Sequence, residues 1–170
     1  MFKCWIDPQL FEKWGLCPEG TTCRLLHADV RPGGHYHVRE EWPDGKLVYT
    51  KFEFRRIRPN EELVFVTSLS DETGKTVEHP FWPEWPTRLL ATVNFEDDES
   101  GVNVNVLWEP LEPSDSQIAF FMQHIDMGRI GWSQTFDRLQ TTIEWANQQA
   151  TKGTSFPPFN GEAPGAAALS

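Results

Sequence analysis

Two histidines, spaced two residues apart, are the first candidates for chemistry. His35 and His37 would share one face of a β-strand, because strand side chains alternate between faces, and imidazole is a common metal ligand. A third ligand is not evident in the sequence, and Tyr36 and Val38 make the opposite face of this strand apolar. We therefore expect both histidines on the solvent side of a sheet, and no metal site.

A carboxylate follows on the apolar face of the same strand. The alternation of Tyr36 and Val38 continues to Glu40, so Glu40 should point toward the interior. A carboxyl buried without a partner has a raised pKa, which suits it to general acid or base work. The alternative is that Glu40 lies at the end of the strand beside solvent, with Trp42 covering its stem. Glu40 is accordingly a weak catalytic candidate.

The three cysteines, Cys4, Cys17 and Cys23, leave one thiol unpaired in any disulfide scheme. Cys17 and Cys23 lack the Cys-x-x-Cys spacing of a zinc or redox pair, so we expect reduced thiols that are buried or in loops. The sequence also lacks the local signatures of serine hydrolases, P-loop proteins, dinucleotide-binding proteins and zinc proteases. Enzyme classes that carry such signatures are disfavoured, and no cofactor is implied.

The composition restricts the class of protein and its partners. A length of 170 residues suits one domain, and 39% hydrophobic residues suffice for one core. A net charge of −10 disfavours binding to nucleic acid or to an anionic membrane. No apolar run is long enough for a membrane span or a signal peptide, so we expect a soluble, cytoplasmic protein. The eight Trp and twelve Phe either fill a core or line a pocket.

A helix, a set of strands and a second helix should follow one another along the chain. Asp7-Pro8 is an N-cap followed by proline, and Gly15 should end the first helix. Apolar residues at helical spacing predict one long helix over 114–149, in which Gly128 and Gly131 suggest a kink or a close approach of another segment. Between the helices, a period of two predicts antiparallel strands near residues 22–29, 35–42, 47–58, 62–70, 87–97 and 102–109.

These elements predict a fold of the α+β class. A curved antiparallel sheet and one long amphipathic helix must cover each other's apolar faces, which leaves room for a cavity between them. We assign residues 1–149 to a single domain and residues 150–170, rich in Pro, Gly and Ala, to a C-terminal tail.

Several short motifs, taken in order, resemble those of a known family. They include Asp7-Pro8 with Trp14-Gly15, Arg31-Pro32-Gly33-Gly34, Ile57-Arg58-Pro59, Thr92-Val93-Asn94-Phe95 and Met127-Gly128 with Gly131-Trp132. In this order and spacing, over residues 1–146, they are similar to the family named for the activator of the heat-shock protein 90 ATPase. That family lies in the START and polyketide-cyclase-like superfamily, so the resemblance implies the helix-grip fold and a hydrophobic cavity between its sheet and C-terminal helix.

The chain departs from this family at three places. Family members begin with one further strand, so the first edge strand is missing here, unless the chain simply begins short of the usual start. The open edge could take up residues 156–159 or a second protomer, which would give a homodimer. Residues 79–86 are denser in aromatic and proline residues than is usual for the family, as suits the rim of a pocket. Phe52 stands where relatives commonly have glycine, which would partly fill the cavity.

We expect a protein that binds a small apolar or amphipathic molecule between the sheet and the helix. Glu40 or Tyr36 would orient this molecule, and the expected lining residues are Tyr36, Phe54, Phe65, Trp82, Trp85, Trp108, Met122 and Trp132. The resemblance leaves two alternatives open. One is an enzyme of the cyclase or aromatase type that uses Glu40 with Tyr36. The other, less expected, is a cofactor of the heat-shock protein 90 chaperone, because the eukaryotic activators carry a separate N-terminal domain that this chain lacks.

Overall fold

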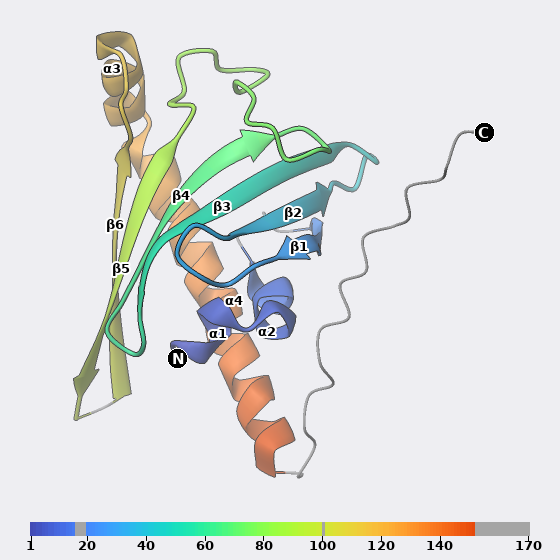
Figure 1. The fold of residues 1–170 in the computed structure, drawn as a ribbon, viewed down its shortest axis with the longest axis vertical. Helices are drawn as coiled ribbons and strands as arrows, with labels where there is room; N and C mark the ends of the chain where they lie inside the picture. Colours follow the sequence, from blue (N-terminus) through green and yellow to red (C-terminus); the bar gives the residue numbers. More distant parts are fainter. Residues whose placement is uncertain (16–19, 100, 152–170) are drawn as a thin grey trace.

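The sheet is a six-stranded antiparallel meander in which each strand lies beside the next one in the sequence (Figure 1). The computed structural model describes residues 1–15, 20–99 and 101–151. Side chains alternate along the strands, and in the fifth strand this places Leu89, Ala91, Val93 and Phe95 in the interior. The strands are β1 (Thr22–Ala28), β2 (His35–Glu41), β3 (Leu47–Arg58), β4 (Glu62–Ser70), β5 (Leu89–Asp98) and β6 (Gly101–Pro110).

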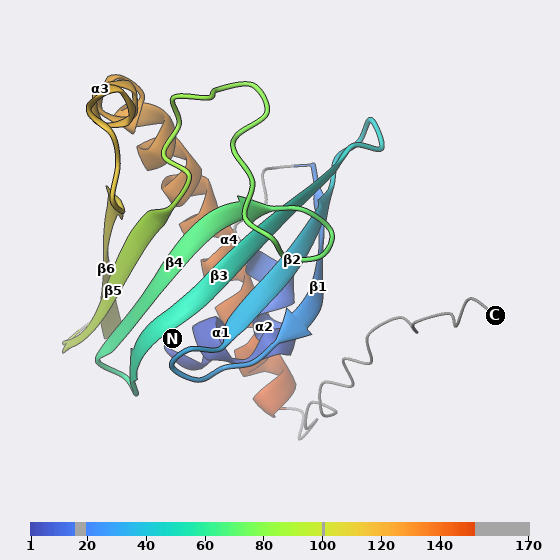
Figure 2. The same ribbon diagram turned by 45° about the horizontal axis from the view of Figure 1, so that its top comes forward.

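Two short helices precede the sheet and lie against its concave side (Figure 2). They are α1 (Lys3–Ile6) and α2 (Pro8–Trp14). The carboxylate of Asp7 accepts the backbone N–H groups of Gln9 and Leu10 at 3.0 and 3.3 Å, which confirms the predicted N-cap of α2.

The C-terminal helical region consists of two helices and not one. They are α3 (Asp115–Gln123) and α4 (Ile125–Thr151), and Ser114 caps α3 with a complete capping box. The prediction of one unbroken helix is therefore wrong at His124. There the imidazole Nδ1 lies 2.8 Å from the carbonyl oxygen of Phe120, so a side chain competes for a carbonyl at the end of α3. Gly128 and Gly131 lie inside α4, away from this break.

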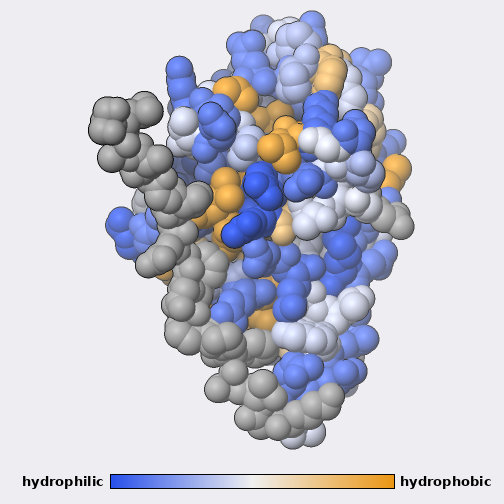
Figure 3. Space-filling view, turned by 90° about the vertical axis from the view of Figure 1, so that its right-hand side faces the viewer, coloured by the Kyte–Doolittle hydropathy of each residue, from blue (hydrophilic) through white to orange (hydrophobic). Residues whose placement is uncertain are grey.

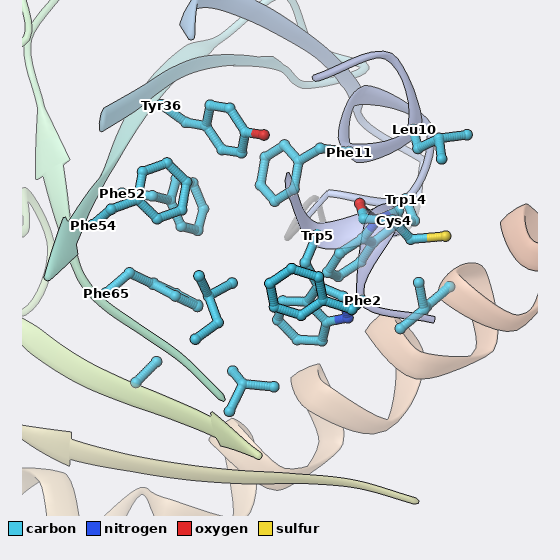
Figure 4. Close-up of a cluster of buried hydrophobic side chains, with 14 of the residues drawn as sticks. Phe2, Cys4, Trp5, Leu10, Phe11, Trp14, Tyr36, Phe52, Phe54 and Phe65 are labelled. Atoms are coloured by element: carbon cyan, nitrogen blue, oxygen red, sulfur yellow. Dashed lines mark hydrogen bonds between the residues drawn. The ribbon is translucent and has the colours of Figure 1, made fainter. Parts of the chain in front are cut away.

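Aromatic side chains of α1 and α2 fill one part of the space between the sheet and α4 (Figure 4). The Trp5 ring lies 4.6 Å from the ring of Trp14, and the Phe11 ring lies 4.6 Å from that of Tyr36 and 5.4 Å from that of Phe52. Burial of each large side chain contributes about 1.5–3 kcal/mol to folding. This part of the concave side is therefore a packed core, and Phe52 helps to fill it as expected.

The sheet ends at β1 on one side and at β6 on the other within the described part of the chain. The structure matches the expected fold, a curved antiparallel sheet against a long C-terminal helix. Residues 156–159, which were proposed to pair with an open edge of the sheet, lie outside the described residues. Pairing with a second protomer stays a prediction.

The state of the cysteines differs from the expectation. Cys4 is a buried free thiol, whereas Cys23 is disulfide-bonded, and Cys17 lies outside the described residues. The expectation of reduced thiols is therefore wrong for Cys23, because the spacing of cysteines along a chain does not decide which of them meet in space.

The face of the molecule seen in Figure 3 is largely hydrophilic, with hydrophobic side chains gathered in small groups. No helix within the described residues has both the length and the apolar character needed to cross a membrane.

The two glycines of α4 differ in their surroundings, and this generates a prediction about stability. A Cβ atom at Gly128 would lie 2.9 Å from Cζ3 of Trp108, whereas a Cβ atom at Gly131 would meet nothing within 4 Å. We expect Gly128→Ala to lower the free energy of unfolding by about 1–3 kcal/mol through overpacking. Gly131→Ala should raise it by up to about 1 kcal/mol through helix propensity. Urea denaturation of both variants checks this, and shifts of the same sign would contradict it.

Candidate functional site

A cavity of about 350 Å³ lies between the sheet, the connection from β4 to β5 and the first half of α4. Figure 1 shows this connection rising above the end of the sheet where α3 and α4 meet. Four tryptophans line the cavity, namely Trp82 and Trp85 from the connection, Trp108 from β6 and Trp132 from α4. Their rings form a continuous series, with centroid distances of 6.3 Å from Trp82 to Trp85, 6.0 Å from Trp85 to Trp108 and 6.4 Å from Trp108 to Trp132.

The aromatic connection between β4 and β5 is held in place by His79. Its Nδ1 accepts the backbone N–H groups of Phe81 and Trp82 at 3.3 and 3.2 Å, and its ring stacks on Trp82 at 4.7 Å. Burial lowers the pKa of His79, so the ring is neutral at pH 7 and can accept these bonds. Lys46 lies 3.8 Å from the ring centroid of Phe81 and attaches the connection to the turn between β2 and β3.

The α4 wall of the cavity depends on the absence of side chains at two positions. Gly128 allows the Trp108 ring to approach the helix backbone, and Gly131 leaves open space. The close approach predicted at this pair of glycines is confirmed at Gly128. Trp132 lies where the cavity meets the core. It lines the cavity, and its ring lies 6.4 Å, centroid to centroid, from the buried ring of Trp5.

Polar groups gather where α4 passes the end of α2. The guanidinium of Arg138 donates to the backbone carbonyls of Trp14 and Gly15 at 3.3 and 3.5 Å and to Oγ1 of Thr135 at 3.3 Å. Arg138, Thr135 and Thr50 all line the cavity. The cavity therefore combines aromatic walls with a hydrogen-bonding part.

Glu40 lies next to this polar part, behind Thr50. Its side chain is in the interior, with the residue only 7% exposed, and Oε1 accepts the Thr50 hydroxyl at 2.9 Å. Burial raises the pKa of Glu40 to about 7, and the bond from Thr50 opposes this rise. The prediction of an inward-facing carboxyl is confirmed, and the alternative of a solvent-exposed strand end is wrong.

Three of the residues expected to line the site lie in the packed core instead. Tyr36, Phe54 and Phe65 are at most 3% exposed and do not line the cavity. The reason is that rings from α1 and α2 cover them: Phe11 lies 4.6 Å from Tyr36, and Trp5 lies 6.4 Å from Phe65 (Figure 4).

Met122 is displaced from the expected site for a different reason. It is 61% exposed on α3, outside the cavity lining. The break at His124 interrupts the helical period on which the expectation for Met122 rested. Trp82, Trp85, Trp108 and Trp132 do come together around the cavity.

Several cavity residues were not anticipated from the sequence, above all Thr50 and Arg138, whereas His79 belongs to the segment 79–86 that was expected at the rim of a pocket. The sequence did contain a signal for Thr50. It lies two residues from Val48, the register partner of Glu40, and residues two apart on a strand share a face, so Thr50 lies on the same face of the sheet as Glu40. Arg138 carried no signal, since its position at the cavity depends on how α4 crosses the end of α2.

The histidine pair differs from the expectation in one respect. His37 is buried, at 6% exposure, although it lies on the face opposite Tyr36. A Cβ atom at Gly74 would lie 3.9 Å from its Nδ1, so the connection after β4 lies against this ring. The solvent-side prediction is therefore wrong for His37. Among the described residues, no group of three His, Cys, Asp or Glu side chains could hold a metal ion.

The position of Tyr36 leads to a test of its role. Its hydroxyl is buried with no hydrogen-bond partner among the described residues. A buried hydroxyl of this kind costs free energy, so we expect Tyr36→Phe to leave the free energy of unfolding unchanged or to raise it by about 1 kcal/mol. Chemical denaturation measures this, with Tyr49→Phe, at a half-exposed position, as the control. A loss of stability specific to Tyr36→Phe would show that its hydroxyl has a partner.

The pKa of Glu40 generates a prediction about pH. Because the folded-state pKa of about 7 exceeds the usual 4.5, the folded state retains this proton longer than the unfolded state, and stability falls as pH rises from 4.5 to 7. Glu40→Gln should remove this fall, which amounts to no more than about 3 kcal/mol. Denaturant midpoints from pH 4 to 8.5 measure it, and Glu41→Gln, at the exposed neighbour, is the matched control. Parallel profiles for wild type and Glu40→Gln would contradict the burial argument.

Comparison with known proteins places this geometry in a family. Over residues 1–144 the chain matches the family model described as activator of Hsp90 ATPase homolog 1-like protein. No curated protein matches the sequence.

Solved structures share the fold at low sequence identity. A Staphylococcus epidermidis protein is 17% identical, with a TM-score of 0.66 over 94% of this chain and 85% of its own. An Arthrobacter aurescens protein is 20% identical, with a TM-score of 0.66 over 84% and 77%. An AHSA1-like protein of Aeromonas hydrophila is 16% identical, with a TM-score of 0.57 over 86% and 83%. The curved antiparallel sheet around a long C-terminal helix is thus the helix-grip fold, and the chain belongs to the family of activator of Hsp90 ATPase homolog 1-like proteins.

Proposed function

We propose that the protein binds a small apolar or amphipathic molecule in the cavity between the sheet and α4. The observation that carries this proposal is a cavity of about 350 Å³ with four tryptophans in its wall, adjacent to a core that is itself closely packed. Ligand sites are typically concave, largely apolar and supplied with a few polar groups, and this cavity has each of these properties.

The walls suit a flat, apolar body. The indoles of Trp85 and Trp108 are inclined at 49° and those of Trp108 and Trp132 at 80°, so faces and edges both border the cavity. An inserted ring could therefore make stacked and edge-to-face contacts, which favour aromatic pairs. Burial of about 200 Å² of apolar surface would contribute about 5 kcal/mol before the cost of association is subtracted.

The cavity is separate from the packed core, which permits a test that leaves folding intact. Gly131 lines the cavity with open space around it, so Gly131→Leu should fill part of the cavity without displacing a neighbour at Cβ. We expect the neutral apolar dye N-phenyl-1-naphthylamine to bind wild type saturably, with one dye per chain, and the variant about tenfold more weakly. Fluorescence titration measures both.

Ala119→Leu is the matched control, because it places the same leucine side chain at an exposed position of α3. This variant should bind the dye as wild type does. Absence of saturable binding to wild type, or equal weakening by both substitutions, would contradict the proposed site.

A further inference from the structure

The charges around the cavity favour an anionic ligand. Among the described residues that line it, none is Asp or Glu, and Arg138 carries the one permanent charge. The other ionisable lining residue, His79, is neutral at pH 7 because burial lowers its pKa. A cationic group entering this cavity would meet a guanidinium, whereas an anionic group would be attracted to it.

Thr50 connects the cavity with Glu40. Thr50 lines the cavity, and its Oγ1 lies 2.9 Å from Oε1 of Glu40. A hydroxyl has one proton to donate, so the group to which Thr50 donates depends on whether Glu40 is ionised. When Glu40 is ionised, Thr50 must donate to Glu40 and offers the cavity only lone pairs. When Glu40 is protonated, it can donate to Thr50, and the Thr50 proton becomes available to a ligand.

We propose that the cavity binds an apolar carboxylic acid in its carboxylate form, and that this binding takes up one proton at Glu40. The aromatic walls hold the apolar body, Arg138 supplies the favourable charge, and Thr50 donates to the carboxylate once Glu40 is protonated. This inference rests on the proposed function and specifies the chemical class of its ligand. For each ligand anion that binds, one proton is taken from the solvent and forms the O–H bond of the Glu40 carboxyl, and no other covalent bond of the protein changes.

Burial and the hydrogen bond from Thr50 are the two influences on the pKa of Glu40. On β1 its register partner is Cys23, which does not titrate in its disulfide, and on β3 its partner is Val48. A second hollow, which Cys23 also lines and which shares Arg138 with the cavity, has two positive and two negative groups in its lining. They are Glu12 and Lys13 from α2 and Asp137 and Arg138 from α4.

The direction of the pH effect follows from these positions. The pKa of Glu40 is about 7, and an anion placed on the far side of the Thr50 hydroxyl would raise it further. Binding of a carboxylate is therefore tighter with protonated Glu40. Its affinity should fall by up to about tenfold per pH unit as pH rises above 7.

Isothermal titration calorimetry with two naphthalene probes tests the proposal on the full chain. The probes are naphthalene-2-carboxylate and naphthalene-2-carboxamide, which share a ring system and differ in charge. We expect the carboxylate to bind more tightly at pH 6.5 than at pH 8.5 and to take up about two thirds of a proton near pH 7.5, where part of Glu40 is already protonated. The uptake is measured in buffers of different ionisation enthalpy. The carboxamide can both donate and accept, so its affinity should change less than threefold over this range.

Two substitutions assign the effect to the Glu40–Thr50 pair. Glu40→Gln provides a permanent donor to Thr50, so it should bind the carboxylate at pH 8.5 as tightly as wild type does at pH 6.5, without proton uptake. Thr50→Val has a similar shape and no hydroxyl, and it should lose at least fivefold in carboxylate affinity at pH 6.5. Circular dichroism of both variants checks that they are folded.

The outcomes separate this inference from the proposed function. If neither probe nor the neutral dye binds, the proposed ligand site itself fails. If the carboxamide or the dye binds but the carboxylate does not, or if the carboxylate binds without proton uptake, the site stands and the inference is overturned. A pH dependence that persists in Glu40→Gln would likewise overturn the role of Glu40.

Discussion

Trp5 is the side chain on which the arrangement of the molecule depends most. It is 2% exposed, and its ring lies within 6.4 Å of the rings of Trp14, Phe65, Phe95 and Trp132. These neighbours come from α2, two strands of the sheet and α4, so one indole contacts all the main parts of the fold. Because protein interiors are closely packed, the size of the Trp5 ring sets the distances between the N-terminal helices, the sheet and α4.

This packing divides the space under α4 into two parts. The rings of α1 and α2 close one part, where Tyr36, Phe52 and Phe54 are fully buried. The other part stays open, because the wall of α4 carries Gly128 and Gly131 at the level of Trp108. The cavity thus forms because the aromatic side chains of α1 and α2 do not extend into this part and because α4 has no side chain at Gly128 and Gly131 to fill it.

The buried carboxyl at the boundary between these parts has an energetic cost. Glu40 is held in the interior by the fixed alternation of β2, although burial opposes its ionisation. A group of this kind reduces stability at neutral pH, and such costs are characteristic of functional positions. Among the described residues, Thr50 donates a hydrogen bond to it, and Thr50 also lines the cavity. The structural cost and the proposed ligand site therefore meet at a single hydrogen bond.

Local patterns in the sequence were sufficient to determine the order of helices and strands, the cap at Asp7 and the inward direction of Glu40, because each depends on neighbours a few residues away. The four tryptophans of the cavity wall were also identifiable from the sequence. The helix break at His124, the burial of His37 and the removal of Tyr36, Phe54 and Phe65 from the cavity were not. The break at His124 involves a side-chain contact with the carbonyl of Phe120, which the apolar period does not reveal. The other two depend on contacts between distant segments: the connection after β4 lies over His37, and the rings of α1 and α2 lie over the sheet. Periodicity tells which face of an element is apolar, but only the tertiary structure decides which other segment covers that face and which part of it stays open.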